Sequence, residues 1–479
     1  MDTRLVIAIV VIIGLWLALG LSTAVHAVMY KRDPRSAAVW LFVGFAMPVV
    51  GPWLYWEFGI NRVKRRALRR RGSRERLFAG GGPHTPAEQT ALDNAVGRLT
   101  TLRDIANRVT RLPLVAGNTL RPLHNGEQAY PEMLDAIRAA QSTISLESYI
   151  FDWDDVGKEF TAALGQAAAR GVKVHVLLDG IGAVASWSRV GRKLLRSGAK
   201  VAAFFPLRLP LGRLRINLRN HRKLLIVDGR VGFTGGMNIS QRHYRDVRDH
   251  RRVEDVHFRL EGPIVAQLQE AFVEDWYLAT GVPLLGDEYF PTFEPCGAAV
   301  CRGIIHGPDE DLEKVHWIIL AALGAAQQSV HIATPYFIPP GSLIAALATA
   351  ALRGVRVTLI LPALVDLPYM RWAADAYLWQ LLEHGVAVYR RPAPFVHTKL
   401  MIVDRRWLLF GSANLDQRSF RLNFEFNVEA YDAALAASLA ERFDVAIAPL
   451  QPVTKEAVDA RPPLTRLRDG AIKLFSPHL

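Results

Sequence analysis

The sequence predicts an α/β protein that contains two copies of one unit and begins with an apolar segment. One supporting observation is a strand–helix–strand pattern that occurs twice along the chain. Another is a polar motif that also occurs twice, with identical internal spacing. A chain of 479 residues is longer than one ordinary core requires, and an apolar fraction of 50% excludes global disorder.

The repeated pattern places a helix between two strands in each copy. The expected strand, helix and strand lie at 143–151, 156–170 and 172–178, and again at 330–338, 343–353 and 355–361. Gly171 and Gly354 end the two helices, as glycine commonly does at a helix C-terminus. The two final strands begin with matching phrases, Gly-Val-Lys-Val and Gly-Val-Arg-Val. Strand–helix–strand units of this kind predict a sheet with helices on its faces.

The second repeated feature is a set of five polar and glycine positions. The two sets are His221, Lys223, Asp228, Gly235 and Asn238, and His397, Lys399, Asp404, Gly411 and Asn414. Each member of the first set lies 176 residues before its counterpart in the second. Such a coincidence at five chemically demanding positions is very improbable by chance. The two motifs therefore indicate two half-sites.

A histidine and a lysine two residues apart on a strand point to the same face. If a pseudo-twofold axis relates the two units, His221, Lys223, His397 and Lys399 meet at one seam. Two ammonium groups neutralise phosphoryl oxygens, while one imidazole attacks phosphorus and the other protonates the leaving oxygen. The motif thus predicts phosphodiester transfer.

Other polar residues are assigned weaker roles. Asp228 and Asp404 belong to the catalytic motif, but each is more plausibly a buried polar contact at the end of its strand. Asn238, Ser412 and Asn414 are expected to support phosphate binding, and Gly236 replaces Ser412 in the first copy. A lone histidine near a strand is usually structural, so no role is assigned to three others, namely His175, His257 and His331.

Each catalytic imidazole should have a carboxylate that fixes its tautomer. Glu425 is the candidate for His397, and Asp255 is the candidate for His221. Asp249 and Glu254 compete with Asp255 for this role.

The N-terminal segment predicts a transmembrane helical hairpin over residues 1–60. Leu5–Met29 is long enough to cross a ~30 Å hydrocarbon core, and Ala37–Phe58 is a second apolar stretch. Pro48, Gly51 and Pro52 interrupt the second stretch. A cleaved signal peptide is the alternative for the first stretch, and a buried core helix is the alternative for the second.

Charge is concentrated just after these stretches. The net charge is +13, and residues 62–76 contain nine Lys or Arg against Glu75 alone. This run favours a cytoplasmic location for the residues after it, and it either binds anionic lipids or only sets the topology. The rest of the chain is mildly basic, so nucleic acid is not favoured as a partner. Cys296 and Cys301 form neither a disulfide framework nor a zinc cluster, which agrees with a reducing compartment.

The duplicated pattern H-x-K-x4-D-x6-G-[GS]-x-N resembles that of the phospholipase D superfamily. The phrases at 217–223 and 411–420, the latter running into Asn423-Phe424-Glu425, are similar to those of bacterial cardiolipin synthases. The N-terminal module resembles theirs through a short set of positions, namely Asp33-Pro34-Arg35, Trp40, Pro48, Gly51 and Tyr55. The resemblance covers nearly the whole chain.

This resemblance implies two phospholipase D-like α-β-α lobes side by side, expected at 121–290 and 291–479 after a basic connector at 61–120. It implies a reaction without metal or cofactor, with His221 as nucleophile and His397 as acid and then base. The expected reaction converts two phosphatidylglycerol molecules to cardiolipin and glycerol. The expected location is the bacterial inner membrane, with a multi-pass anchor and cytoplasmic lobes.

Three other functions stay open on the sequence alone. A phospholipase D-type hydrolase would use the same residues with water as acceptor. A nuclease is disfavoured by the membrane hairpin and by two motifs in one chain, and a non-catalytic membrane scaffold by the intact His and Lys. The sequence leaves open whether phosphatidylethanolamine or a cytidine-activated lipid is the second substrate. It also leaves open the acyl preference and the oligomeric state. The choice of His221 over His397 as nucleophile rests on the family resemblance alone.

Overall fold

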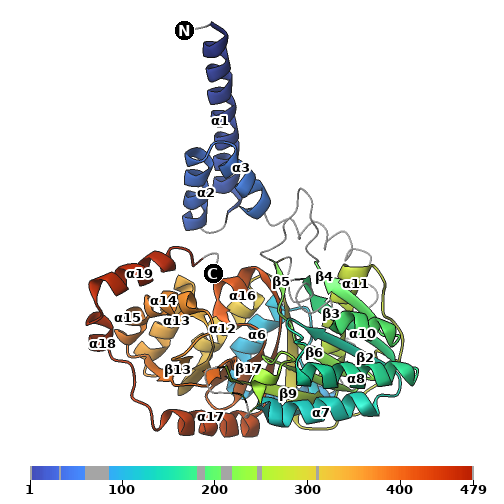
Figure 1. Ribbon diagram of the computed structural model, residues 1–479. Coiled ribbons are helices and arrows are strands. Elements are labelled where there is room, and N and C mark those ends of the chain that lie inside the picture. The colour runs from blue at the N-terminus through green and yellow to red at the C-terminus, as the bar shows by residue number, and fades with distance from the viewer. Residues whose placement is uncertain are drawn as a thin grey trace. The chain divides into compact units, whose positions relative to one another are not determined.

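The computed structural model describes residues 3–31, 34–59, 86–180, 189–205, 218–244, 247, 251–308 and 312–476. Its described residues form two compact units, the N-terminal helices and the chain from residue 86 onward (Figure 1). The basic run at 62–76 and the competing carboxylate Asp249 lie outside the described residues.

The N-terminal unit begins with one long apolar helix, α1 (Thr3–Tyr30). Its length and hydropathy suffice to cross a membrane, and nearly all of its apolar side chains are exposed. Helix α2 (Pro34–Ala46) packs against α1, where Gly20 faces Phe45. A Cβ atom at Gly20 would lie 2.9 Å from the Phe45 ring, so the small residue permits this close approach.

The second expected span does not form one helix. After α2 the chain continues as α3 (Val50–Leu54) and a π-helical turn, η1 (Tyr55–Gly59). Val49 has a φ of 65° at the break, directly after Pro48. The 13 residues of α2 cover about 20 Å, which is short of a ~30 Å hydrocarbon core. Among the described helices, α1 alone is long and apolar enough to span.

The larger unit is organised by one 15-stranded sheet of the described residues. The first lobe supplies β1 (Val115–His124), β2 (Thr143–Ser148), β3 (Lys173–Asp179), β4 (Lys200–Phe204), β6 (Leu224–Val227), β7 (Val231–Gly235) and β9 (Val256–Glu261), and also β5 (Arg219–Asn220), which pairs with β19 off the main path. The second lobe supplies β10 (Ala299–His306), β11 (Ser329–Ala333), β13 (Arg356–Pro362), β14 (Ala387–Arg391), β16 (Leu400–Val403), β17 (Trp407–Gly411) and β19 (Asn423–Tyr431).

The strand order is symmetric about the centre of this sheet. It runs β14-β13-β11-β16-β17-β19-β10 and continues β1-β9-β7-β6-β2-β3-β4. Each strand of one half therefore has a counterpart at the same distance from the central β1–β10 pair. The two lobes are related by the expected pseudo-twofold symmetry.

The predicted repeats are confirmed, with small differences in their bounds. In the first copy β2 and β3 pair in parallel around α8 (Asp155–Ala169), and in the second β11 and β13 pair around α13 (Gly341–Leu352). Gly171 and Gly354 have φ angles of 95° and 86°, the left-handed conformation expected where a helix ends. Both first strands end several residues earlier than expected.

The remaining helices cover the sheet. The first lobe carries α7 (Asn125–Ala139), α10 (Val190–Arg196), η3 (Gln241–His243) and α11 (Ile264–Thr280). The second carries α12 (Lys314–Ala325), α14 (Pro368–Asp375), α15 (Leu378–Leu382), α16 (Gln417–Arg421), α17 (Ala433–Ile447), α18 (Lys455–Asp459) and α19 (Pro463–Lys473). The expected lobe boundary at 290 falls between α11 and β10, and the expected start at 121 falls within β1.

The connector contains the helical stretch expected near 86–108. It forms α5 (Pro86–Val96), a short 3-10 turn η2 (Gly97–Leu99) and α6 (Thr100–Val109). Leu92 and Leu102 are buried in the core of the second lobe, and α6 packs on α12. This part of the connector is therefore integrated into the second lobe.

Candidate active site

Two short strand pairings tie the lobes together beside the motif histidines. Strand β5 (Arg219–Asn220) pairs in parallel with the start of β19, and β15 (Phe395–Val396) pairs in parallel with β8 (Val253–Glu254). Asn220 pairs with Phe424 and Val396 with Glu254. His221 follows Asn220, and the partner of Asn220 precedes Glu425 in the other lobe. In the same way, His397 follows Val396, and the partner of Val396 precedes Asp255.

This register decides which carboxylate contacts which imidazole. His221 Nδ1 lies 3.0 Å from Glu425 Oε2, and His397 Nδ1 lies 2.9 Å from Asp255 Oδ2. The predicted pairs, Glu425 with His397 and Asp255 with His221, are wrong because each carboxylate crosses to the opposite lobe. His221 and Lys223 also interact electrostatically with His397, so the two pairs belong to one centre to which both lobes contribute.

The histidines do not lie within a ladder of the main sheet, contrary to the expectation for an H-x-K strand. His221 donates its backbone N–H to Phe424 O, and His397 donates to Glu254 O, so both bond across the seam. Side chains still alternate, because Arg222 points away from the centre. Its guanidinium is fully buried and bonds Asp275 and the backbone oxygens of Glu425 and His306.

The two lysines complete the cluster. Lys223 Nζ donates to the backbone oxygen of His221 at 2.5 Å. Lys399 Nζ donates to the backbone oxygen of His397 at 2.7 Å and lies 3.1 Å from both of its ring nitrogens. Both lysine side chains are buried. The site therefore concentrates positive charge around two imidazoles, as binding of a phosphodiester requires.

Burial and the neighbouring charges set the protonation of the site. Burial lowers the pKa of His221 to about 4 and that of His397 well below its ordinary value. Burial likewise lowers the pKa of Lys223 to about 7 and that of Lys399 to about 8. Both imidazoles are then neutral at neutral pH, and each Nδ1–H can donate to its carboxylate, which leaves Nε2 with its lone pair.

The two carboxylates differ. Burial alone would raise the pKa of Glu425, but His221, Lys223 and the Ser412 hydroxyl together lower it to about 2. Burial raises the pKa of Asp255, and Lys399 only partly offsets this. One cause of this difference is a serine that is present in only one half-site. Ser412 Oγ donates a hydrogen bond to Glu425 at 2.5 Å, whereas Gly236, the counterpart of Ser412, lies beside Asp255 and has no hydroxyl.

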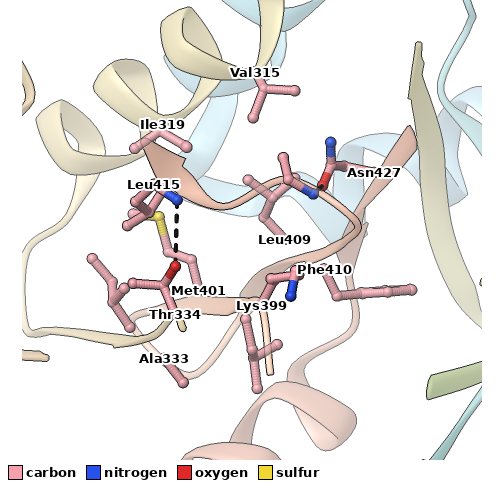
Figure 2. A pocket seen from close by; sticks show the side chains of 13 residues that line it. Val315, Ile319, Ala333, Thr334, Lys399, Met401, Leu409, Phe410, Leu415 and Asn427 are labelled. Atoms are coloured by element: carbon pink, nitrogen blue, oxygen red, sulfur yellow. Dashed lines mark hydrogen bonds between the residues drawn. The ribbon is translucent and has the colours of Figure 1, made fainter. Parts of the chain in front are cut away.

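Side-chain hydrogen bonds fix the loop that carries Ser412 and Asn414. Asn427 Oδ1 accepts from the backbone N–H of Ala413, and Thr334 Oγ1 accepts from that of Leu415 (Figure 2). The pocket drawn there lies beside Lys399 and is lined mainly by apolar side chains of the second lobe. This lining suits a packing gap rather than a headgroup site.

The supporting asparagines are not equivalent. Asn238 Oδ1 accepts from the backbone N–H of Ile150, so it ties two loops of the first lobe together. Asn414 Oδ1 is buried and has no hydrogen-bond partner among the described residues. Asn414 therefore retains the capacity to take part in ligand binding that was expected of both.

Asp228 and Asp404 do not contact the histidine and lysine centre. Asp228 accepts backbone N–H bonds from residues 141, 142 and 143 just before β2. Asp404 accepts bonds from residues 327, 328 and 329 just before β11, and pairs with Arg98 at 2.7 Å. Both carboxylates thus make the structural contact that the sequence favoured for them, since they hold the turn before the first strand of each repeat, and these contacts give no support to their place in the catalytic set.

Sequence reasoning missed one side chain next to the centre. The Tyr149 ring meets the His221 ring edge-on at a centroid distance of 5.0 Å, and Lys223 Nζ lies 5.3 Å from its centre. Tyr149 directly follows β2 and has no aromatic counterpart at Pro335. Three histidines without an assigned role, His175, His257 and His331, are buried in β3, β9 and β11.

The comparisons with known proteins agree with this geometry. The family model described as cardiolipin synthase, PLD-like domain, matches residues 133–276 and 319–447, which is more than half of the chain. The chain is 32% identical over 478 residues to the major cardiolipin synthase ClsA of Bacillus subtilis, covering 98% of this chain and 99% of that protein. This chain belongs to the cardiolipin synthase family with phospholipase D-like domains.

Other relatives extend the comparison. Cardiolipin synthase A of Pseudomonas aeruginosa is 34% identical over 465 residues, covering 96% of this chain and 94% of that protein. Among solved structures, phosphatidylserine synthase of Haemophilus influenzae superposes with a TM-score of 0.61 at 16% identity. It covers 79% of this chain and 100% of that one, which shows the shared two-lobe fold. The two matched stretches of the family model correspond to the two lobes.

Proposed function

We propose that this chain is a cardiolipin synthase, a phosphatidyltransferase that converts two phosphatidylglycerol molecules to cardiolipin and glycerol. The observation that carries the proposal is the pair of H-x-K segments at one seam, in a chain similar to cardiolipin synthases along nearly its whole length. The membrane segment agrees with a lipid substrate and a lipid acceptor.

In the proposed first step, His221 Nε2 attacks the phosphorus of one phosphatidylglycerol. In the substrate complex the anionic phosphodiester favours a protonated His397, and this imidazolium gives its Nε2 proton to the headgroup oxygen as the bond to glycerol breaks. Lys223 and Lys399 neutralise the phosphoryl oxygens as charge builds up. The products are free glycerol and a phosphatidyl group bonded to the His221 ring.

In the second step, a glycerol hydroxyl of another phosphatidylglycerol gives its proton to His397 and attacks the same phosphorus. The bond to His221 breaks, cardiolipin leaves, and both imidazoles return to their starting state. The choice of His221 as nucleophile is supported by Glu425, whose low pKa keeps a negative charge beside the phosphorylated, positively charged ring. No step requires a metal ion or another cofactor.

Product analysis separates this reaction from hydrolysis. The purified chain is incubated with labelled phosphatidylglycerol, and the lipids are resolved by thin-layer chromatography. Cardiolipin with an equal amount of glycerol supports the proposal. Phosphatidic acid without cardiolipin would assign a phospholipase D-type hydrolase, and no turnover would favour a scaffold.

We also propose that the N-terminal unit is a multi-pass anchor in the bacterial inner membrane, with the lobes in the cytoplasm. Helix α1 supplies one crossing, and α2 with α3 supplies the return in two pieces. The nine basic residues at 62–76 favour the cytoplasmic side. An alkaline phosphatase reporter fused after residue 80 should be inactive, and high periplasmic activity would reverse the assignment.

A further inference from the structure

The second lobe exposes an unusual group of large apolar side chains far along the sequence from the N-terminal helices. Eight of the fourteen such side chains exposed among the described residues from 86 onward lie in two segments, 364–379 and 464–475. The second segment contributes Leu464, Leu467, Leu474 and Phe475, which are 80%, 69%, 76% and 59% exposed. Helices α14 and α19 of these segments pack against each other, so the two segments share one surface.

These side chains fall on one side of α19 and the turn that follows it. Leu464 and Leu467 are three residues apart, Leu467 and Leu474 seven, and Leu464 and Phe475 eleven. These spacings place them along a single stripe of a helix. The opposite side attaches α19 to the lobe, where Asp469 is buried and pairs with Arg461, and where Ile472 packs on the core.

Basic and aromatic groups border the stripe. Arg466, Arg468 and Lys473 lie on α19 itself, and the only carboxylate of that helix is the buried Asp469. A depression beside the helix is lined by Trp379, Leu467, Arg466 and Lys473, among others. An exposed apolar stripe flanked by cations and a tryptophan is the composition of helices that lie in the headgroup layer of anionic membranes.

The same surface leads to the candidate site. Helix α14 follows β13 and a loop whose Asp366 accepts a hydrogen bond from the Tyr336 hydroxyl. The Tyr336 ring contacts Phe395, and Phe395 contacts the ring of His397. A bilayer seated on α14 and α19 would therefore lie next to the side of the site where His397 meets the acceptor.

We propose that the stripe on α19, together with the exposed apolar residues of 364–379, is a docking surface that inserts into the headgroup layer of an anionic phospholipid membrane. It holds the second lobe against the bilayer independently of the N-terminal helices. The alternative is that a second copy of this chain covers the surface. Spin labels on the surface distinguish the two, because a membrane would bury them in the bilayer and a second copy would bring two labels close together.

The test measures the depth of nitroxide labels in the full chain. Cys296 is exposed and is replaced by Ser, whereas the buried Cys301 stays in place. Single cysteines are then introduced by Leu464→Cys, Leu467→Cys and, as a matched control, Val445→Cys on α17, which is 68% exposed. Figure 1 shows α17 and α19 at opposite edges of the second lobe.

Each labelled protein is reconstituted in vesicles of equal parts phosphatidylglycerol and phosphatidylcholine. Collisions with oxygen, which concentrates in the bilayer, are compared with those of a water-soluble nickel chelate. Labels at 464 and 467 should collide more often with oxygen than with the chelate, and the label at 445 should collide more often with the chelate. Labels at 464 and 467 that favour the chelate would overturn the proposal. Lipid-independent spin–spin broadening at 467 would overturn it too, because it places a second copy on the stripe.

A second arm tests the consequence for turnover and rests on the proposed function. Leu464→Asp with Leu467→Asp should lower cardiolipin formation in those vesicles several-fold, while Val445→Asp should not. Turnover of a dissolved short-chain phosphatidylglycerol should be the same in the wild type, the double variant and the Val445→Asp control, and a parallel loss in the double variant there would overturn the proposal. The depth measurement needs no turnover, so failure of docking and failure of the proposed reaction are separable.

Discussion

At the scale of residues, the two half-sites are related by symmetry but are not chemically equal. The difference begins at one position, where Ser412 donates to Glu425 while Gly236 stands next to Asp255. Glu425 is thereby held ionised beside His221, whereas burial raises the pKa of Asp255 beside His397. This asymmetry supports a fixed division of labour, with His221 as nucleophile and His397 as proton carrier.

Adding a side chain at Gly236 should separate Asp255 from His397. A Cβ atom there would lie 2.4 Å from Asp255 Oδ2, which contacts the His397 ring, so the carboxylate must move. We expect Gly236→Ser to lower kcat by about 100-fold, less than the loss of about 10⁴-fold that follows when an orienting carboxylate is disabled, because Asp255 is displaced and not removed. Steady-state kinetics measures the effect.

Gly324→Ser on α12 is the matched control, because its added Cβ meets nothing within 4 Å. The control should keep wild-type kcat. Wild-type kcat in Gly236→Ser would show that the Asp255 contact does not matter for turnover.

The lysines predict how activity depends on pH. Burial lowers the pKa of Lys223 to about 7 and that of Lys399 to about 8, so Lys223 loses its proton as the pH rises past about 7 and Lys399 as it rises past about 8. We expect kcat/KM to fall from about pH 7 upward, because the free enzyme then loses its cations for the phosphate one after the other. Since a bound phosphodiester stabilises the charged lysines, kcat should persist to higher pH. A kcat/KM that stays flat up to about pH 10 would contradict these assignments.

At the scale of elements, the sequence predicts the helices and strands better than it predicts which side chains contact each other in the site. Strands, helices and terminating glycines of the repeat follow from apolar patterning, and the motif spacing predicts which residues gather. The pairing of each histidine with a carboxylate of the other lobe could not be predicted. It depends on strands of two residues that pair across the lobes, and two residues are too few to show the alternating pattern of a strand. The break in the second apolar stretch was visible in Pro48, but where the helix would stop depends on packing against α1.

Replacing an aspartate that holds the turn before β2 or β11 should lower the stability of the fold and leave the chemical step unaffected. Asp228 accepts three backbone N–H bonds, so Asp228→Ala should lower the free energy of unfolding by about 2 to 3 kcal/mol. Thermal unfolding measures this loss. The folded fraction at low temperature should retain most of its kcat, and a complete loss of turnover in folded protein would return Asp228 to the catalytic set.

At the scale of the whole molecule, one sheet passes through both lobes and brings two distant motifs to a single centre. Neither lobe contains a complete site, since each imidazole depends on a carboxylate of the other lobe. Family membership, the N-terminal apolar helix and the proposed docking stripe agree with a transferase that takes both of its substrates from a membrane.

Both histidines should therefore be indispensable while metal ions are not. We expect His221→Ala and His397→Ala each to lower turnover by at least about 1000-fold, because each removes one role from a shared mechanism. Excess EDTA should leave the wild-type rate unchanged. A rate that vanishes with EDTA and returns with one divalent ion would contradict a two-histidine reaction.

The most direct test of the two-histidine reaction is to trap the covalent intermediate and locate it. Phosphatidylglycerol labelled at phosphorus is mixed with the enzyme, the reaction is stopped in alkali within milliseconds, and the peptides are mapped. We predict label on the peptide that contains His221, and none on that peptide in His221→Ala. Label on no histidine, with cardiolipin still being formed, would contradict a phosphohistidine route.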